Sequence, residues 1–293
     1  MESSSDILKQ VRRIEIKTRG LSNDIFAGKY HSAFKGRGMA FSEVREYRVG
    51  DDVRDIDWNV TARSRQPHIK IYEEERELTM MLLIDVSGSR MFGTTEKLKK
   101  NTITEIAAVL AFSAAQNNDK VGCIFFSDRV EKFIPPKKGR AHVLMIIKEL
   151  ISFMPENNGT DISEGLRYLT NILKKRSTAF VLSDFMDTAD GRARFEDALK
   201  IASGKHDMVG IRVYDRREQQ LPDVGILELK DAETGEKVWV DTASRAVREA
   251  YARNWEQTSA LIDSSLKRCR VDNVEIATGE DYVTSLMKLF KRR

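Results

Sequence analysis

Apolar residues give way abruptly to polar ones in the stretch Thr79-Met80-Met81-Leu82-Leu83-Ile84-Asp85-Val86-Ser87-Gly88-Ser89. An uninterrupted apolar run of this length is typical of a strand that is buried on both faces of a parallel sheet. The residues that follow place a carboxylate and two hydroxyls just beyond the strand, and Gly88 permits a tight turn there. The stretch therefore predicts a central parallel strand with a polar loop at its carboxyl end.

Four more apolar runs follow, at residues 121–126, 130–134, 179–182 and 208–214. Between them, Ile103, Ile106, Ala107, Leu110 and Ala114 recur at the spacing of one helix face, and similar helices fit residues 141–153, 161–175 and 193–203. Strands that alternate with helices predict a doubly wound α/β domain with a mainly parallel sheet over residues 79–215.

The flanking parts, residues 1–78 and 216–293, are expected to form an N-terminal irregular/β subdomain and a C-terminal β-hairpin plus helices. In the first part, residues 5–30 contain an amphipathic helix followed by a turn at Gly20, and residues 68–73 alternate like a half-exposed strand. In the second part, residues 225–229 and 237–240 flank a turn around Glu233-Thr234-Gly235, which predicts a hairpin added to the sheet edge. A helix over residues 244–267, a short strand through Val274 and Ile276 and a helix from about Asp281 follow.

The composition of the 293 residues excludes several classes of protein. Lys and Arg number 49 against 45 Asp and Glu, a net charge of +4 that is too small a surplus to indicate nucleic-acid binding. No stretch approaches the roughly 18 apolar residues of a membrane span, and the amino terminus has no targeting pattern. Cys123 and Cys269 lack a neighbour at metal-ligand or redox spacing, which suits a reducing compartment. We expect a cytoplasmic protein that binds no nucleic acid and does not insert into the membrane.

Candidate metal ligands lie where the predicted strands end. Asp85 stands at the end of the first apolar run, and Asp184 stands just after the run at 179–182. Thr160 lies just ahead of a predicted helix. Open α/β sheets bind ligands at this carboxyl edge. The candidate ligands are Asp85, Ser87, Ser89, Thr160 and Asp184. All five offer oxygen donors, two charged and three neutral, and such a set suits Mg²⁺ or Mn²⁺ better than zinc. Because hydroxyls carry no charge, they leave such an ion able to bind a carboxylate from another molecule. The resting protein need not carry the ion.

In order and approximate spacing, these five residues resemble the metal-ion-dependent adhesion site of von Willebrand factor A domains, over about residues 79–215. The resemblance implies that the hydroxyls coordinate a metal directly and the carboxylates directly or through water. The sequence departs from the pattern at Ser183-Asp184-Phe185, where many such domains have Thr-Asp-Gly. The bulky Phe185 is therefore expected to alter access, and Asp187 is a further carboxylate nearby.

A second and more specific block runs from Gly36 through Tyr47, then from Gly50 through Trp58, and ends in Ala62-Arg63. It resembles the signature of an uncharacterised bacterial von Willebrand factor A-like family, typically encoded beside MoxR-type AAA+ ATPases and membrane-anchored von Willebrand A proteins. The resemblance implies that these proteins are the partners. A simpler interpretation is that the alternating charges of residues 43–63 form ion pairs that tie an irregular segment to the domain.

Motifs of the common enzyme classes are absent: there is no phosphate-binding loop, dinucleotide fingerprint, nucleophile elbow or His-Glu-x-x-His. We expect a non-enzymatic, metal-dependent protein-interaction module that works with a MoxR-type AAA+ ATPase in the assembly or maturation of protein complexes. The alternative is a Mg²⁺-dependent hydrolase acting on a phosphate ester. That alternative lacks an evident general base, because the histidine nearest in sequence to a site loop is His142.

Overall fold

The computed structural model describes residues 9, 11–16, 40–73, 78–93 and 98–293. The chain divides into two compact units, Phe34–Leu78 and the combination of Met1–Ala33 with Thr79–Arg293. Residues 11–16 are helical and belong to the larger unit, where Val11 is buried and Glu15 is ion-paired with Arg140. The expected turn at Gly20 lies outside the described residues.

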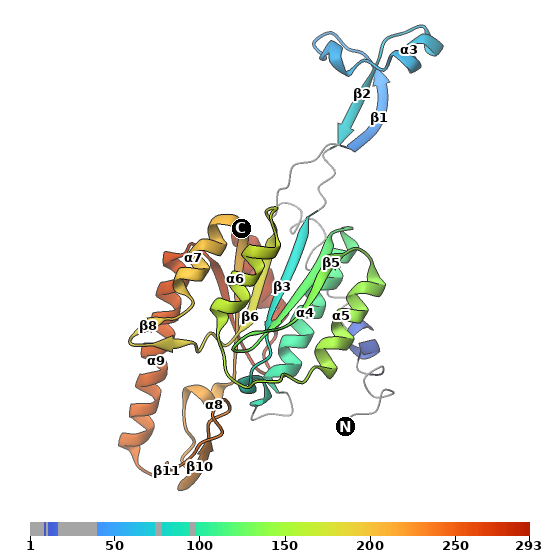
Figure 1. Cartoon of the computed structure of the whole chain (residues 1–293). Helices are drawn as coiled ribbons and strands as arrows, with labels where there is room; N and C mark the ends of the chain where they lie inside the picture. Colours follow the sequence, from blue (N-terminus) through green and yellow to red (C-terminus); the bar gives the residue numbers. More distant parts are fainter. Residues whose placement is uncertain (1–8, 10, 17–39, 74–77, 94–97) are drawn as a thin grey trace. The chain divides into compact units, whose positions relative to one another are not determined.

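A six-stranded sheet in the order β12-β9-β6-β3-β4-β5 forms the centre of the larger unit (Figure 1). Its strands are β3 (Thr79–Asp85), β4 (Lys120–Phe126), β5 (Val130–Lys137), β6 (Thr178–Ser183), β9 (Asp207–Tyr214) and β12 (Asp272–Ala277). All neighbouring pairs are parallel except β4 and β5. The predicted doubly wound, mainly parallel sheet is confirmed.

The strand order reverses beside β3. From β3 the chain proceeds to β4 on one side of the sheet and later to β6 on the other, and Met81 faces Gly122 and Ala179 in the two registers. The carboxyl ends of β3 and β6 therefore flank a topological switch point, the place where open α/β sheets bind ligands.

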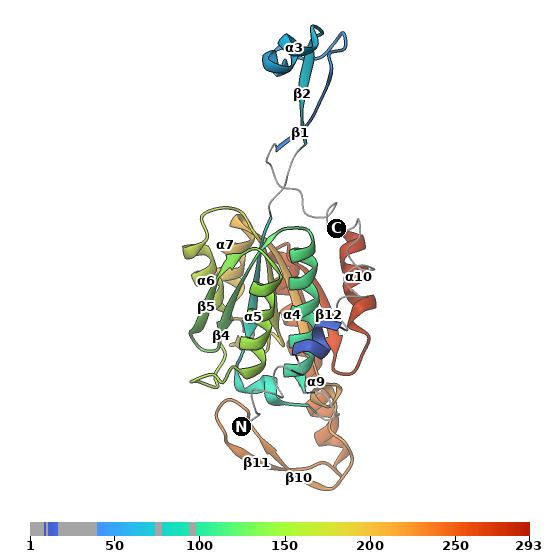
Figure 2. The ribbon, with the colours of Figure 1, turned by 90° about the vertical axis from the view of Figure 1, so that its right-hand side faces the viewer.

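Helices cover both faces of the sheet (Figure 2). On one face lie α6 (Ile162–Ile172), α7 (Glu196–Lys205) and α9 (Arg245–Arg268), which share a core with β3 residues such as Leu83. On the other lie α4 (Lys99–Gln116), α5 (Arg140–Ser152) and α10 (Tyr282–Arg292), where Phe290 packs edge-on against Phe180 with ring centroids 6.3 Å apart. The apolar face of each predicted helix is thus the face that covers the sheet.

The C-terminal hairpin consists of β10 (Ile226–Lys230) and β11 (Lys237–Asp241), which form an antiparallel two-stranded sheet of their own. The prediction that this hairpin extends the sheet edge is wrong. The edge beside β9 is taken by β12, which pairs with β9 from Asp272 to Ala277. Two further small elements were not predicted: the strand pair β7 (Thr188–Ala189) and β8 (Arg192–Ala193), and the short helix α8 (Arg216–Gln219).

The smaller unit is an antiparallel pair, β1 (Ala40–Glu46) and β2 (His68–Glu73), joined through a 3-10 turn η1 (Val53–Asp55) and helix α3 (Trp58–Ser64). The Arg45 guanidinium donates to both carboxylate oxygens of Asp51, each at 2.8 Å. Asp57 caps α3 by accepting from the N–H groups of Asn59 and Val60 at 3.0 and 3.2 Å. These charges therefore stabilise the fold of the unit itself. Among the helices that the structure describes in either unit, none is both long and apolar enough to cross a bilayer.

Candidate functional site

Asp85 is the last residue of β3, and its carboxylate is held by both neighbouring segments. Its Oδ1 accepts the N–H of Ser87 at 2.9 Å, and its Oδ2 accepts the hydroxyl of Ser183, at the end of β6, at 2.6 Å. The side chain is only 3% exposed. Burial and the nearby charge of Asp184 raise the pKa of Asp85 to about 6. The end of β3 thus presents a fixed carboxylate whose charge is poorly solvated.

Ser87 and Ser89 lie in the loop after β3, where the 3-10 turn η2 (Gly88–Met91) begins. Their hydroxyl oxygens are 3.2 Å apart, and Ser87 is fully buried. The Ser87 hydroxyl lowers the pKa of Asp85 and the Ser89 hydroxyl lowers that of Asp184, so the two hydroxyls lie close to the two carboxylates.

Asp184 directly follows β6 and is 6% exposed. Its Oδ1 accepts the N–H of Met186 at 3.1 Å, and its Oδ2 accepts the ammonium of Lys99 at 2.8 Å. Burial alone would raise the pKa of Asp184, but the charge and hydrogen bond of Lys99 outweigh it and lower the pKa. Lys99 therefore compensates the charge of Asp184 directly.

Lys99 and its second partner were not predicted from the sequence. Lys99 is the first residue of α4, is 1% exposed, and also donates to Glu218 of α8 at 2.6 Å. Nothing in the sequence separates this lysine from the adjacent Lys100, because only the fold shows that it is buried. Glu218 carries a weak signal: with Asp215 it forms the capping box that starts α8.

A second buried cation, Arg90, lies close enough to Asp85 for their charges to interact. It is 3% exposed, and its Nη2 donates to the carbonyl of Phe153 at 2.5 Å. Its Nε and Nη1 have no hydrogen-bond partner within the described part of the chain. Burial lowers its pKa to about 10, against the opposing effect of Asp85.

Thr160 reaches the site from the loop before α6. This loop is tied to the β3 loop by a hydrogen bond from the N–H of Gly88 to the carbonyl of Asn158 at 2.9 Å. The Thr160 hydroxyl donates to Glu233 in the β10–β11 turn at 2.5 Å. Burial raises the pKa of Glu233, and the charges of Asp85 and Asp184 act in the same direction. The structure thus brings Asp85, Ser87, Ser89 and Asp184 together and adds Thr160 beside a carboxylate that sequence reasoning missed.

Phe185 and Asp187 have structural roles. Phe185 is 1% exposed and packs against Phe195 with ring centroids 5.6 Å apart, so the expectation that it alters access to the site is wrong. Its φ of +59° is the left-handed conformation that glycine adopts most readily. Asp187 accepts the N–H of Ile162 at 3.1 Å and so supports the start of α6.

The donor set fits a hard divalent cation. Nowhere in the described ranges do three or more His, Cys, Asp or Glu side chains form a group that could hold an ion, so a cation at this place would need hydroxyl donors as well. The surrounding charges also fit: the carboxylates of Asp85, Asp184, Glu218 and Glu233 face the cations Lys99 and Arg90, which leaves two negative charges in excess. A divalent cation would balance that excess.

Several known proteins are similar to this chain. The protein Rv1480 of Mycobacterium tuberculosis, described as uncharacterized, is 26% identical over 285 residues, which cover 97% of this chain and 88% of the relative. MAV169 of Mycobacterium avium, also described as uncharacterized, is 23% identical over 162 residues, which cover 55% of this chain and 93% of the relative.

Among solved structures, the conserved hypothetical protein BatB of Bacteroides thetaiotaomicron matches with a TM-score of 0.48 at 15% identity, over 73% of this chain and 98% of its own. A von Willebrand factor type A protein from Catenulispora acidiphila matches with a TM-score of 0.40 at 11% identity, over 76% of this chain and 43% of its own. The model of the family described as "protein of unknown function DUF58" matches residues 43–260, and the chain belongs to this family.

Proposed function

We propose that this chain is a non-enzymatic protein-interaction module whose binding depends on Mg²⁺ or Mn²⁺ held by Asp85, Ser87, Ser89, Thr160 and Asp184. The observation that carries the proposal is the convergence of two buried carboxylates and two hydroxyls at the switch point of the sheet, with Lys99 compensating one of the carboxylates directly. The ion would supply an electrophilic centre, since three of its five protein ligands are neutral. An acidic side chain of a partner protein would be attracted to that centre.

The partner that we propose is a MoxR-type AAA+ ATPase, acting in the cytoplasm and alongside membrane-anchored von Willebrand A proteins. Support comes from the resemblance of residues 36–63 to the signature of a family encoded beside such ATPases. The module would then assist the assembly or maturation of protein complexes.

The phosphate-ester hydrolase alternative finds less support in the geometry, because it needs a general base near the ion. Nε2 of His142 is hydrogen-bonded to the carbonyl of Val121 at 3.0 Å. Val121 pairs with Met80 near the amino end of β4, whereas Asp85 pairs with Phe126 at the carboxyl end of the same strands. His142 therefore lies at the opposite edge of the sheet from the site.

The metal site is tested by calorimetric titration of the protein with Mn²⁺ and Mg²⁺. We expect binding by the wild type, loss of binding in Asp85→Ala, and wild-type binding in the control Asp197→Ala, whose carboxylate is exposed on α7. Bound ion should also stabilise the fold by about 2.7 kcal/mol at a hundredfold excess over Kd. A wild-type melting temperature that millimolar Mg²⁺ and Mn²⁺ leave unmoved would refute the site.

The partner is tested by co-purification from the native cell. We expect the ATPase to accompany the wild type and Asp197→Ala, and to be depleted with Asp85→Ala and Thr160→Ala. The variants are a cleaner probe than chelation, since the ATPase itself needs Mg²⁺ for its nucleotide. Undiminished recovery of the ATPase with Asp85→Ala would place the contact on another surface.

A further inference from the structure

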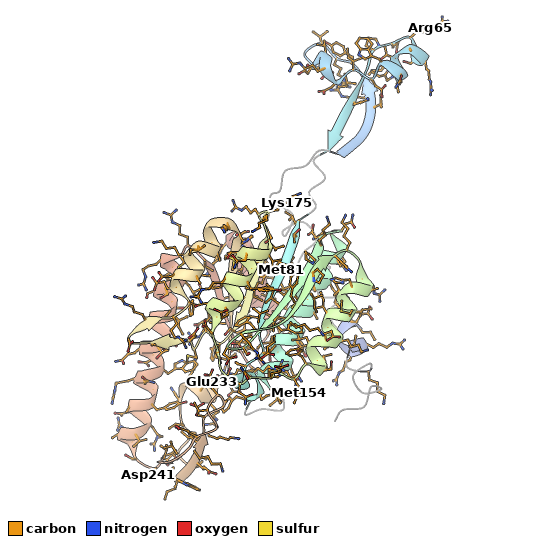
Figure 3. All side chains as sticks on the ribbon, viewed as in Figure 1. Arg65, Met81, Met154, Lys175, Glu233 and Asp241 are labelled. Carbon is orange, nitrogen blue, oxygen red and sulfur yellow. The ribbon has the colours of Figure 1, made fainter. Side chains whose placement is uncertain are left out.

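Positive charge gathers at the amino edge of the sheet, where the parallel strands begin and which is opposite to the candidate metal site. The chain passes this edge in the α6–β6, α7–β9 and α9–β12 connections and at the end of α10. Figure 3 shows Lys175 of the α6–β6 connection at the end of the larger unit that lies opposite Glu233. The exposed basic residues of these four segments, here called the basic edge, are Lys174, Lys175, Arg176, Lys205, Arg270, Lys291 and Arg292.

The segments of the basic edge lie side by side. The hydroxyl of Ser177, which follows Arg176, is 3.0 Å from Nδ1 of His206, which follows Lys205. The strands β6, β9 and β12 that begin here are direct neighbours in the sheet. Strands are about 4.8 Å apart, so the three strand starts span roughly 10 Å. The charges therefore act together on anything that approaches this edge, because the span matches the Debye length of about 8–10 Å.

Acidic residues do not neutralise the basic edge. Asp207 and Asp272 begin β9 and β12, and both are ion-paired with Arg293, which is not one of the seven basic residues. Asp119, just before β4, is only 2% exposed. None of the seven forms an ion pair within the described part of the chain. The four glutamates and one arginine of residues 73–77, which precede β3 in the sequence, offset at most three of the seven charges.

Exposed apolar side chains accompany the basic edge. Ile172, the last residue of α6, is 37% exposed, and Ile201 on the neighbouring helix α7 is 59% exposed. Apolar side chains beside lysines and arginines are typical of surfaces that bind a membrane interface, where cations meet lipid phosphates and apolar groups enter the acyl boundary. Single-stranded nucleic-acid sites place aromatic rings among the cations instead. The rings of His206 and Phe290 in these segments are 2% and 3% exposed and thus unavailable for stacking.

We infer that the basic edge docks the larger unit on a membrane surface rich in anionic phospholipids. Docking of this kind is peripheral and requires no helix that spans the bilayer. Each Lys or Arg near such a surface strengthens partitioning about fivefold. The inference is independent of any metal ion. It adds that the candidate metal site, at the opposite edge of the sheet, faces away from the bilayer and stays open to a partner.

The test is co-sedimentation of the full chain with vesicles of phosphatidylglycerol and phosphatidylcholine in equal parts, compared with vesicles of phosphatidylcholine alone. We expect the wild type to sediment with the anionic vesicles only. Binding should weaken from about 0.1 to 1 M salt, as the screening length falls from about 10 to 3 Å. The triple variant Lys174→Glu/Lys175→Glu/Arg176→Glu should lose at least about a hundredfold in partitioning, since three cations are lost at about fivefold each.

The matched control reverses three exposed cations that lie outside the basic edge, in Lys148→Glu/Arg217→Glu/Lys230→Glu. It changes the net charge by the same amount, so a general effect of charge would weaken both triple variants equally. We expect the control to keep most of the wild-type binding. Ile201→Ser should weaken binding by a similar factor at low and high salt, because it removes an apolar contact that salt does not screen.

Three outcomes would overturn the inference. The first is a wild type that stays in the supernatant with the anionic vesicles. The second is equal binding by the two triple variants. The third is binding of a DNA duplex or of inorganic polyphosphate, at about 0.15 M salt, as tightly as the anionic vesicles per phosphate, because the edge would then be a general polyanion site.

Discussion

The ammonium of Lys99 lies 2.8 Å from a carboxylate oxygen of Asp184, and the two side chains are 1% and 6% exposed. Burial of two charges is costly, and their attraction offsets that cost only while both are present. Glu218 contributes a second carboxylate to Lys99 at 2.6 Å. The pair therefore ties α4, β6 and α8 together at the carboxyl edge of the sheet.

Replacement of Lys99 by methionine should destabilise the protein strongly. The variant keeps most of the side-chain volume but leaves Asp184 buried without its cation, and loss of one partner of a buried pair typically costs about 3–5 kcal/mol. Urea denaturation measures the change. Lys174→Met, at an exposed position, is the control and should change little. Equal stabilities for the two variants would show that the pair contributes nothing.

The contribution of Asp85 to the stability of the metal-free protein should fall as the pH rises from about 4 to 6. In the folded state the pKa of Asp85 is raised to about 6, against a usual value of 3.8, so the folded chain retains a proton that the unfolded chain has lost. The stabilisation is complete below the unfolded pKa and disappears as the pH passes the folded pKa. Two pKa units correspond to a loss on the order of 3 kcal/mol.

Asp85→Asn isolates this effect, because its side chain stays neutral at every pH. In the presence of a chelator we expect the variant to be more stable than the wild type at pH 7.5 and similar to it at pH 4, as measured by urea denaturation. A constant difference between the two proteins across this range would contradict the assignment to Asp85. The comparison of two variants cancels the titration of other groups, Asp184 included.

Gly88→Ala should disturb the contact between the β3 loop and the hairpin. The added Cβ would meet the Ala232 carbonyl at 2.2 Å, and backbone atoms cannot yield as a flexible side chain can. We expect a loss of about 1–3 kcal/mol, typical of overpacking, and faster hydrogen exchange in residues 226–241. Gly204→Ala has open space around the new atom and should leave both measurements near the wild type.

Asp57→Ala tests whether the charges of the smaller unit are structural. The variant removes the cap of α3 and the charge beside Lys70, so exchange of α3 amides should increase about fivefold, as expected for a lost N-cap. Arg45→Ala should similarly loosen the turn that Asp51 closes. Variants that exchange like the wild type but no longer bind the ATPase would instead make residues 43–63 a recognition surface.

Most of the sheet could be predicted from the sequence, because a strand buried on both faces needs a continuous apolar run. The apolar runs over residues 80–86 and 121–126 correspond to strands Thr79–Asp85 and Lys120–Phe126, so the first strand is displaced by one residue and the second begins one residue earlier. The position of the hairpin could not be predicted in the same way. The alternation in residues 226–230 shows that β10 has two different faces, but not which element lies beside them.

The residues of the candidate site also fall into those that the sequence predicts and those that it does not. Asp85 and Asp184 could be found because each stands where an apolar run ends, and parallel strands bring such ends to one edge. Lys99, Arg90 and Glu233 could not, since each is an ordinary charged residue in a helix or turn, and only tertiary packing buries or aims it. Sequence periodicity reports on strands and helices, whereas the charge balance of a site depends on contacts between distant segments.

The edge strand β5 limits how this molecule can associate with others. It pairs with β4 on one side, and its carboxyl half contains Pro135 and Pro136, which lack the N–H groups that a further strand would need. Lys132 and Lys137 add charge to the same strand. This edge of the sheet is therefore protected against the addition of a strand from another molecule.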